Sequence, residues 1–393
     1  MTKLRSTLWA AFLVMAAFVC SVPASLGQFF GDFWTFSGKF GFVDKRGALV
    51  IPAKFEVARS FHQGLAAVQL NEKWGFVDRS GKLVIEPKFE LVGDFSQGLA
   101  SAAIVVGRSM KSGYIDRSGR FVIKPQFELA SDFSEGLASV STTSDRDQRW
   151  GYINRQGKLV IPSVFDYAGP FKEGRAVVLA EGSGGRFFGF IDPSGEWVVK
   201  PQFKLARDFS NAFAVVKTRD WGAPRWGHIH SDGQLAVLPR FESVGDFADD
   251  LAPALVATDT DKIWCYVNSR DQIVLKTPYT EVRKFSEGLA AVADVAPGAA
   301  WLLVATGGYV ENMLKWGCID RDGKQVVPLK FYRIEDFREG LAAVRTGAFP
   351  NGTWGFINKS SKLVIPAKYC QAASFSEGLA AVGIGRFEPT KKF

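Results

Sequence analysis

The chain has 393 residues, of which 47% are hydrophobic and 22% are charged, with 48 Lys and Arg against 40 Asp and Glu. Four cysteines in a chain of this length exclude a disulfide scaffold. The excess of basic residues is small, and nucleic acid is not an expected partner.

Residues 1–27 have the pattern of a secretory signal peptide. Lys3 and Arg5 precede an apolar run from Leu8 to Val22, and small residues follow it up to Gly27. We therefore expect cleavage after this segment, a secreted or periplasmic protein, and no transmembrane segment in the mature chain. A lipoprotein anchored at Cys20 and an uncleaved anchor are the alternatives. Cleavage leaves 46 basic against 40 acidic residues, and 46 − 40 is a net charge of +6.

After a lead-in over residues 28–39, one unit recurs nine times. Each copy is numbered from one position, which is glycine in every copy except the seventh: Gly41, Gly75, Gly113, Gly151, Gly189, Gly227, Cys265, Gly317 and Gly355. The step is 34 residues once, 38 six times and 52 once, a period that marks a solenoid, a propeller or an array. The repeat domain spans 40–385, with an insertion near 296–314, and residues 386–393 form a tail.

One copy predicts a β-meander with two turns. Its segments are a strand at 74–78, a turn at 78–81, a strand at 83–85 that Pro87 closes, a poorer strand at 89–95, a turn at 96–98 and a strand at 99–106. Asp or Asn begins the first turn in eight copies because its side chain can bond the backbone two residues on. His230 is the exception.

The strands read as continuous apolar runs, such as Leu83-Val84-Ile85, so we expect both of their faces to be covered by neighbouring units. Twenty positions after the repeat glycine all nine copies have Phe. Since burying one Phe stabilises by roughly 1.5 to 3 kcal/mol, this Phe is the expected main packing contribution of each unit.

The segments Trp-Gly-Phe/Tyr-Ile/Val-Asp, Gly-Lys-Leu-Val-Ile-Pro and Phe-Ser-Glu-Gly-Leu-Ala-Ala-Val resemble the WG-containing (KWG) repeat family of bacteria over about nine-tenths of the chain. The resemblance implies a bacterial exported repeat protein and transfers no catalytic residue. Units five to seven depart from the pattern at Asn211-Ala212-Phe213, at Asp249-Asp250-Leu251 and at Cys265, which puts the regularity of that arc in question.

The expected fold is all-β, a propeller-like closed ring of tandem meanders. The chain begins with the second half of a unit, residues 40–52, and ends with the first half of another, residues 369–385. These halves can complete one another and close a ring. Nine units exceed the usual four to eight blades, so an open β-solenoid or superhelix is the alternative.

Few residues suggest catalysis or metal binding. His228 and His230 share a strand face but have no third ligand in view, so no metal, cofactor or catalytic residue is predicted. Cys265 and Cys318 are expected to pack as small apolar residues. Lys and Arg four and seven positions after the repeat glycine could form a basic rim for a polyanion; a rim neutralised by the Glu and Asp of the second turn is the favoured interpretation.

The predicted function is a non-enzymatic extracytoplasmic binding or scaffold protein for a protein, a peptide or a cell-surface glycan. A hydrolase on a repeat scaffold and a structural envelope component are the alternatives. The loops opposite the two regular turns differ in every unit, and variable loops on a rigid scaffold are typical of binding surfaces. We therefore predict ligand contacts at Trp221, Trp301 and Tyr309. The insertion could instead be a packed hairpin cap.

Overall fold

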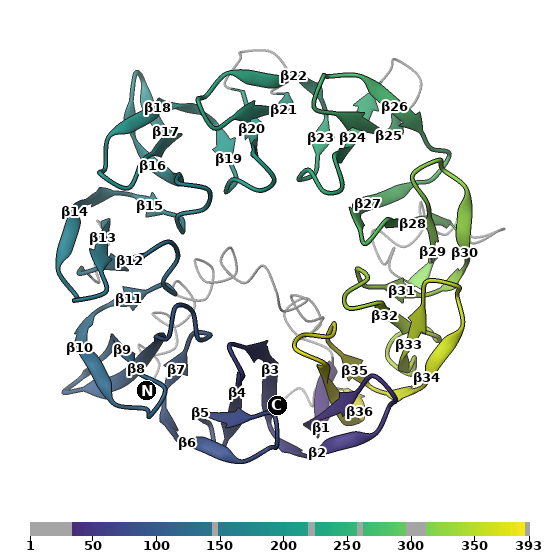
Figure 1. Ribbon diagram of the computed structural model, residues 1–393, viewed down its shortest axis with the longest axis horizontal. Helices are drawn as coiled ribbons and strands as arrows, with labels where there is room; N and C mark the ends of the chain where they lie inside the picture. The colour runs from purple at the N-terminus through teal and green to yellow at the C-terminus, as the bar shows by residue number, and fades with distance from the viewer. Residues whose placement is uncertain (1–33, 144–147, 219–224, 258–261, 296–311, 390–393) are drawn as a thin grey trace.

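The computed structural model describes residues 34–143, 148–218, 225–257, 262–295 and 312–389. Within these ranges the chain forms nine four-stranded antiparallel sheets and no α-helix. Figure 1 shows the sheets arranged as the blades of a ring, with one edge of each sheet toward its centre. The protein is a nine-bladed β-propeller, which confirms the predicted closed ring.

Each sheet has one inner, one second, one third and one outer strand. The inner strands are β3 (Val57–His62), β7 (Leu91–Val92), β11 (Leu129–Ala130), β15 (Tyr167–Ala168), β19 (Leu205–Ala206), β23 (Ser243–Val244), β27 (Glu281–Ser286), β31 (Arg333–Ile334) and β35 (Gln371–Ala372). The second strands are β4 (Leu65–Leu70), β8 (Ala100–Val106), β12 (Leu137–Ser141), β16 (Ala176–Gly182), β20 (Phe213–Lys217), β24 (Leu251–Ala257), β28 (Leu289–Val295), β32 (Leu341–Arg345) and β36 (Leu379–Pro389). The third strands are β1 (Trp34–Asp44), β5 (Lys73–Asp78), β9 (Ser109–Ile115), β13 (Trp150–Asn154), β17 (Gly185–Ile191), β21 (Trp226–His230), β25 (Lys262–Asn268), β29 (Leu314–Ile319) and β33 (Trp354–Asn358). The outer strands are β2 (Leu49–Phe55), β6 (Leu83–Phe89), β10 (Phe121–Phe127), β14 (Leu159–Phe165), β18 (Trp197–Phe203), β22 (Leu235–Phe241), β26 (Ile273–Lys276), β30 (Gln325–Phe331) and β34 (Leu363–Tyr369).

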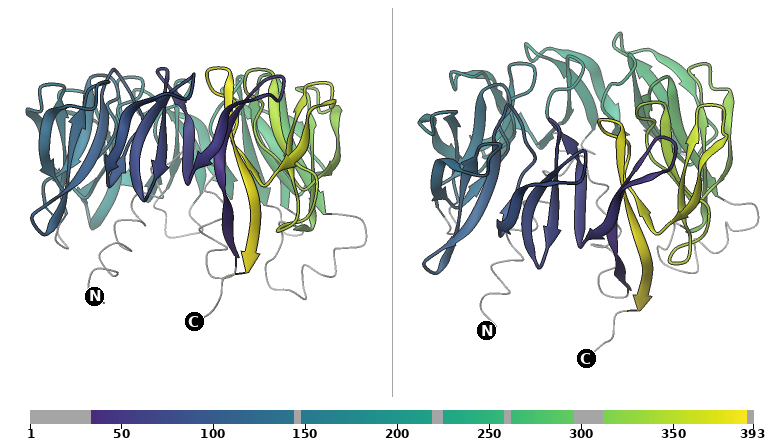
Figure 2. Two further views of the ribbon diagram at one scale, coloured as in Figure 1. Left: turned by 90° about the horizontal axis from the view of Figure 1, so that it is seen from below. Right: turned by 60° about the horizontal axis from the view of Figure 1, so that its bottom comes forward.

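The two ends of the chain share one sheet, which closes the ring. Its strand order is β2-β1-β36-β35, and β1 pairs with β36 continuously from Trp34 opposite Pro389 to Asp44 opposite Leu379. Figure 2 shows this pair extending beyond the other strands on one side of the ring. The predicted lead-in is therefore strand from Trp34 onward, and the predicted tail is strand as far as Pro389.

The repeat unit defined from the sequence does not correspond to one sheet of the structure. Counted from the repeat glycine, a unit gives the third and outer strands of one sheet and then the inner and second strands of the next. Residues 40–52 and 369–385 are therefore the second and first halves of a sheet and not of a unit. The prediction that each unit is a separate meander was wrong in this respect. Every unit is therefore tied covalently to two neighbouring blades.

The repeat glycine lies beside a bulge in the outer strand. Trp74 pairs with Phe89 and Phe76 pairs with Ile85, so the outer strand has two extra residues opposite Gly75. A Cβ atom on Gly75 would lie 2.4 Å from the Ile85 carbonyl oxygen. Pro87 lies in this bulge, where no backbone N–H is needed. The strand continues to Phe89, so the expectation that it ends at Pro87 was wrong.

The Phe residues twenty positions after the repeat glycine fill the space between adjacent blades. All nine are buried: Phe61, Phe95, Phe133, Phe171, Phe209, Phe247, Phe285, Phe337 and Phe375. Most contact an aromatic ring of the preceding blade, as Phe133 contacts Tyr114 with ring centroids 4.7 Å apart. The second strands are buried on both faces, as predicted. The outer strands are not, because Val50 and Val84 are about 40% exposed at the circumference.

Both regular turns lie on one face of the ring, which we call the turn face. In the turn between third and outer strands, the Asp78 carboxylate accepts hydrogen bonds from the backbone N–H groups of Ser80 and Lys82. In the turn between inner and second strands, two consecutive residues have positive φ, as at Gln97 and Gly98. The loops between second and third strands lie on the opposite face, the loop face.

Units five to seven complete their blades despite their irregular sequence. Where Cys265 replaces the glycine, it pairs directly with Lys276, and the outer strand β26 is only four residues long. The thiols of Cys265 and Cys318 are both buried, as the packing prediction required. Burial raises the pKa of the Cys265 thiol to about 11 and that of Cys318 to about 12.

Candidate functional site

The residues predicted to contact a ligand, Trp221, Trp301 and Tyr309, lie outside the described residues, as does most of the insertion. Its last three residues are described. The Asn312 side chain exchanges two hydrogen bonds with the Phe349 main chain, at 2.9 and 3.1 Å, and Met313 and Leu314 are buried. The end of the insertion is therefore packed against the next blade, and a loop-face site stays a prediction.

The turn face is joined by side-chain to backbone hydrogen bonds between blades. The Glu, Gln or Asp of one inner turn accepts from a backbone N–H in the next blade, and the last blade bonds to the first. The pairs are Gln63 with Gly98, Gln97 with Gly136, Glu135 with Gly174, Glu173 with Ala212, Asp249 with Gly288, Glu287 with Gly340, Glu339 with Gly378 and Glu377 with Gly64.

The predicted basic rows lie against these same turns. Arg117 and Arg155 donate to the carbonyl oxygens of Gln63 and Gln97, and Lys359 forms a 3.2 Å ion pair with Glu287. These contacts favour the neutralised rim for the row four positions after the glycine, because its cations bond to the second turns, and Lys45 and Lys359 pair with their acids.

His228 has a structural role. Tyrosines at the equivalent position donate to a carbonyl of the next blade, as Tyr152 does to Gly169 at 2.7 Å. The His228 Nε2 lies 2.8 Å from the Gly245 carbonyl oxygen, and burial lowers the pKa of the ring to about 4. The described residues contain no group of three or more His, Cys, Asp or Glu placed to hold a metal ion.

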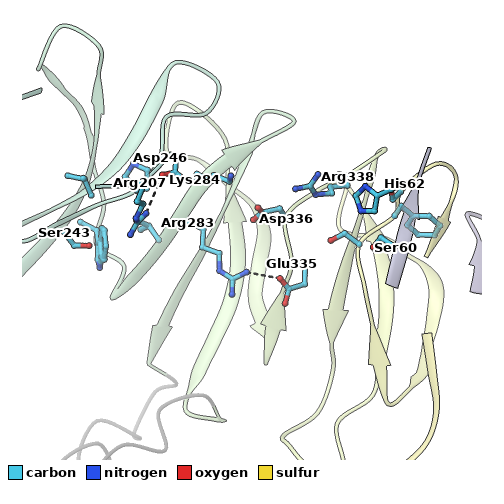
Figure 3. A pocket seen from close by; sticks show the side chains of 18 residues that line it. Ser60, His62, Arg207, Ser243, Asp246, Arg283, Lys284, Glu335, Asp336 and Arg338 are labelled. Atoms are coloured by element: carbon cyan, nitrogen blue, oxygen red, sulfur yellow. Dashed lines mark hydrogen bonds and ion pairs between the residues drawn. The ribbon is translucent and has the colours of Figure 1, made fainter. Parts of the chain in front are cut away.

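A cleft of about 560 Å³ lies at the inner side of the ring. It is lined by six consecutive sheets, from the one that begins with β19, through the closing sheet, to the one that begins with β3. Figure 3 shows its charged side chains, which come from the inner strands and the turns that follow them. We call it the inner cleft.

Two arginines of the inner cleft are held within the scaffold. Arg283 lies over the Trp316 ring at 4.5 Å, donates to the Ile334 carbonyl at 2.8 Å and approaches Glu335 at 3.4 Å. Arg207 lies over the Trp226 ring at 5.7 Å and approaches Asp246 at 3.5 Å. Dashed lines in Figure 3 mark both ion pairs.

Elsewhere around the ring, the acid nineteen positions after the repeat glycine supports the preceding blade. Asp132 accepts hydrogen bonds from the Asp94 backbone N–H and the Ser101 hydroxyl, both at 3.2 Å. A Cβ atom on Gly93 would lie 1.8 Å from its Oδ1 atom, so glycine is required there. Burial and the Asp94 carboxylate raise the pKa of Asp132 to about 6.

The inner cleft lies where this pattern changes. Lys284 occupies the acid's position opposite Gly245, and Arg338 occupies a position that is serine in five of the nine copies. No hydrogen bond or ion pair of either side chain is found within the described parts of the chain. His62 also replaces that serine and lies 3.6 Å from Asp94. Comparing the nine copies position by position could have identified these residues from the sequence.

A second pocket, of about 340 Å³, lies beside the closing sheet and is mostly apolar. Phe36, Phe349 and Phe387 gather there, with ring centroids 5.6 Å apart for Phe36 and Phe387 and 5.0 Å for Phe349 and Phe387. These rings pack the extended β1–β36 pair against the neighbouring blade.

The family profile described as WG containing repeat matches nine segments: 40–74, 74–103, 113–142, 150–182, 188–220, 226–256, 264–293, 316–348 and 354–385. No curated protein sequence matches this chain. No helix in the described ranges is long and apolar enough to cross a membrane.

Solved structures similar to this chain include three peptidases or peptidase domains. A dipeptidyl peptidase 4 from Porphyromonas gingivalis is 8% identical, with a TM-score of 0.50 over 78% of this chain and 58% of that one. A prolyl endopeptidase is 11% identical, with a TM-score of 0.42 over 87% of this chain and 57% of that one. The β-propeller domain of the Trilobed protease from Pyrococcus furiosus is 10% identical, with a TM-score of 0.38 over 71% of this chain and 99% of that one. This chain thus spans just under three-fifths of the length of the two peptidases.

Proposed function

The chain belongs to the WG containing repeat family, and from this premise we propose that it is a non-enzymatic binding protein that works outside the cytoplasm. Its partner is a protein, a peptide or an envelope glycan, and the inner cleft is where that partner binds. The proposed periplasmic or secreted location rests on the signal peptide predicted for residues 1–27.

The observation that carries this proposal is the position of Lys284 and Arg338. Polar side chains of the inner turns form contacts between blades around the ring, whereas these two cations face the inner cleft without such a contact in the described chain. Polar groups that converge on a cleft of about 560 Å³ are typical of a ligand site. Arg207, Arg283 and Glu335 in the same lining are held by contacts within the scaffold.

The lining favours binding over hydrolysis. A glycosidase-type mechanism needs a carboxylic acid that can donate a proton. The Glu335 carboxylate lies 2.7 Å from the Arg333 Nε atom and 3.4 Å from Arg283, so it is held between two guanidinium groups in a contact within the scaffold.

The test uses residues 28–393, an envelope extract and a variant that fills the inner cleft. Ser60→Trp places a large ring on the lining, and Gln156→Trp places the same ring on the exposed turn face as a matched control. We expect saturable retention of an extract component by the wild-type chain and the control, and its loss in Ser60→Trp.

Turnover of wall polysaccharide that a single carboxylate substitution abolishes would contradict the proposal, as would the absence of any saturable ligand. Retention by Ser60→Trp equal to that of the control would exclude the inner cleft. The loop face with Trp221, Trp301 and Tyr309 would then be the site to test.

A further inference from the structure

We infer that the inner cleft binds an acidic saccharide, with Lys284 and Arg338 holding its carboxylate and the Trp264 ring stacking on a sugar face. This inference rests on the proposed function and names the ligand chemistry of the same site. Three departures from the repeat, each with an internal comparison elsewhere in the ring, support it.

Lys284 places a positive charge at a repeat position that usually carries a negative one. Five of the nine copies have Asp there, and Asp132 shows the structural role, which is to accept hydrogen bonds from the preceding blade. A lysine has no acceptor and cannot perform this role. The Lys284 ammonium lines the inner cleft instead, and an ammonium without a protein acceptor is suited to an anionic ligand group.

Arg338 also replaces a residue that has a structural role in other copies of the repeat. The serine usual at its position donates to the Phe carbonyl of the next blade, as Ser286 does to Phe337 at 2.7 Å. Lys172, the other long cation at this position, forms a 3.1 Å ion pair with Asp208. No such pair of Arg338 is found in the described chain, and its guanidinium can bind a carboxylate through two parallel hydrogen bonds.

Trp264 lacks the arginine that lies over three other tryptophans of the ring. Arg59, Arg207 and Arg283 lie over the tryptophan of their own blade, with distances to the ring centroid of 4.7, 5.7 and 4.5 Å. In the blade of Trp264 the corresponding residue is Gly245, which has no side chain to cover the ring. Trp264 therefore lines the inner cleft, and its Nε1 is fixed by the Thr280 carbonyl at 3.0 Å.

A saccharide fits this lining better than a peptide does. An aromatic face suits the apolar face of a pyranose ring, and the hydroxyls of Ser60, Ser243 and Ser374, which also line the cleft, suit its hydroxyl groups. A peptide bound as an added strand needs a regular free edge. The inner strand β27 has a register shift between Val282 and Phe285, where Lys284 lies.

The experiment titrates residues 28–393 with trigalacturonate by calorimetry. The comparison probes are the methyl-esterified trimer, which is neutral, and triglutamate, which carries carboxylates on a peptide. We expect one saturable site for trigalacturonate and at least about tenfold weaker binding of the ester, because hydrogen bonds to charged groups contribute roughly 1.5 to 3 kcal/mol each. Equal binding of the ester, tighter binding of triglutamate, or full competition by equimolar inorganic phosphate overturns the inference.

Two pairs of variants locate the contact. Lys284→Gln/Arg338→Gln should weaken trigalacturonate at least about tenfold, whereas Lys82→Gln/Arg108→Gln, which removes the same charges from exposed positions, should change it less than about twofold. Trp264→Phe keeps an aromatic ring and should weaken binding less than Trp264→Leu. Unfolding midpoints of all variants identify any loss caused by misfolding.

The outcomes separate this inference from the proposed function. An extract component retained by wild type and by Lys284→Gln/Arg338→Gln alike, but lost in Ser60→Trp, supports an inner-cleft binding protein and overturns the acidic saccharide. Failure to retain any component overturns the proposed function itself.

Discussion

Two arcs of the ring, β3–β18 and β19–β30, have the same fold but distribute their polar groups differently. In the first, each inner turn has a glycine in its second left-handed position, and acids such as Asp132 support the preceding blade. In the second, Ala212 and Asp250 replace that glycine in two of the three inner turns, and Lys284 replaces the acid in the blade that begins with β27. The apolar layer between blades is common to both arcs. Apolar packing between the blades therefore maintains the ring in both arcs. Polar positions of the second arc are then available to line the inner cleft.

The largest expected effect concerns what both arcs share, which is ring closure. Deleting residues 371–393 removes β35 and β36 and leaves β1 and β2 without their partner strands. We expect global loss of structure, measured by circular dichroism and protease resistance. If only the closing sheet becomes protease-sensitive while both arcs stay folded, the blades are independent, and closure does not stabilise them.

Removing a Phe from between the blades should lower the free energy of unfolding equally in either arc. Phe133 contacts Tyr114 in the first arc, and Phe285 contacts Tyr266 in the second, with ring centroids 4.7 and 4.8 Å apart. Phe133→Ala and Phe285→Ala should each lower the free energy of unfolding by about 3 to 5 kcal/mol, measured by denaturant titration. A much smaller loss for Phe285→Ala would show that the irregular arc is also loosely packed.

The buried acid of the first arc, Asp132, should leave a pH signature. The pKa of the Asp132 carboxyl is raised to about 6 in the folded chain from a usual 3.8. The folded state therefore binds more protons between these values, so this group's contribution to stability falls as pH rises from about 4 to about 6. Asp132→Asn should become more stable relative to wild type across that window, measured by thermal midpoints. Lys284→Gln, at the equivalent position, should show no trend there.

The smallest expected effect comes from restoring glycine at a left-handed turn position of the second arc. Ala212 has a φ of 68° where the regular copies have glycine. A left-handed non-glycine residue costs roughly 1 to 2 kcal/mol, so Ala212→Gly should stabilise the chain by about 1 kcal/mol, measured by denaturant titration. Gly136→Ala makes the reverse change in the first arc and should destabilise the chain by a similar amount. A destabilised Ala212→Gly variant would show that the left-handed turn is not strained.

The sequence by itself determined what repeats. The identical Phe in nine copies required a common packed layer. The Asp or Asn at eight of the nine first turns required a side-chain bond to the backbone, and the incomplete units at the two ends predicted closure. These features follow from the chemistry of individual turns and strands and from the repeat period, because they recur from copy to copy. The neutralised rim was predictable because both turns of a meander must lie on one face.

Only the tertiary structure decided which positions meet between blades. The sequence does not say that Asp132 covers Gly93 of the preceding blade, because that contact depends on how adjacent sheets are offset around the ring. Nor does it say that Val84 is exposed at the circumference although the neighbouring Ile85 is buried. Lys284 and Arg338 belong to consecutive units separated by the long insertion. Curvature of the ring brings them, with Trp264, onto the wall of one cleft.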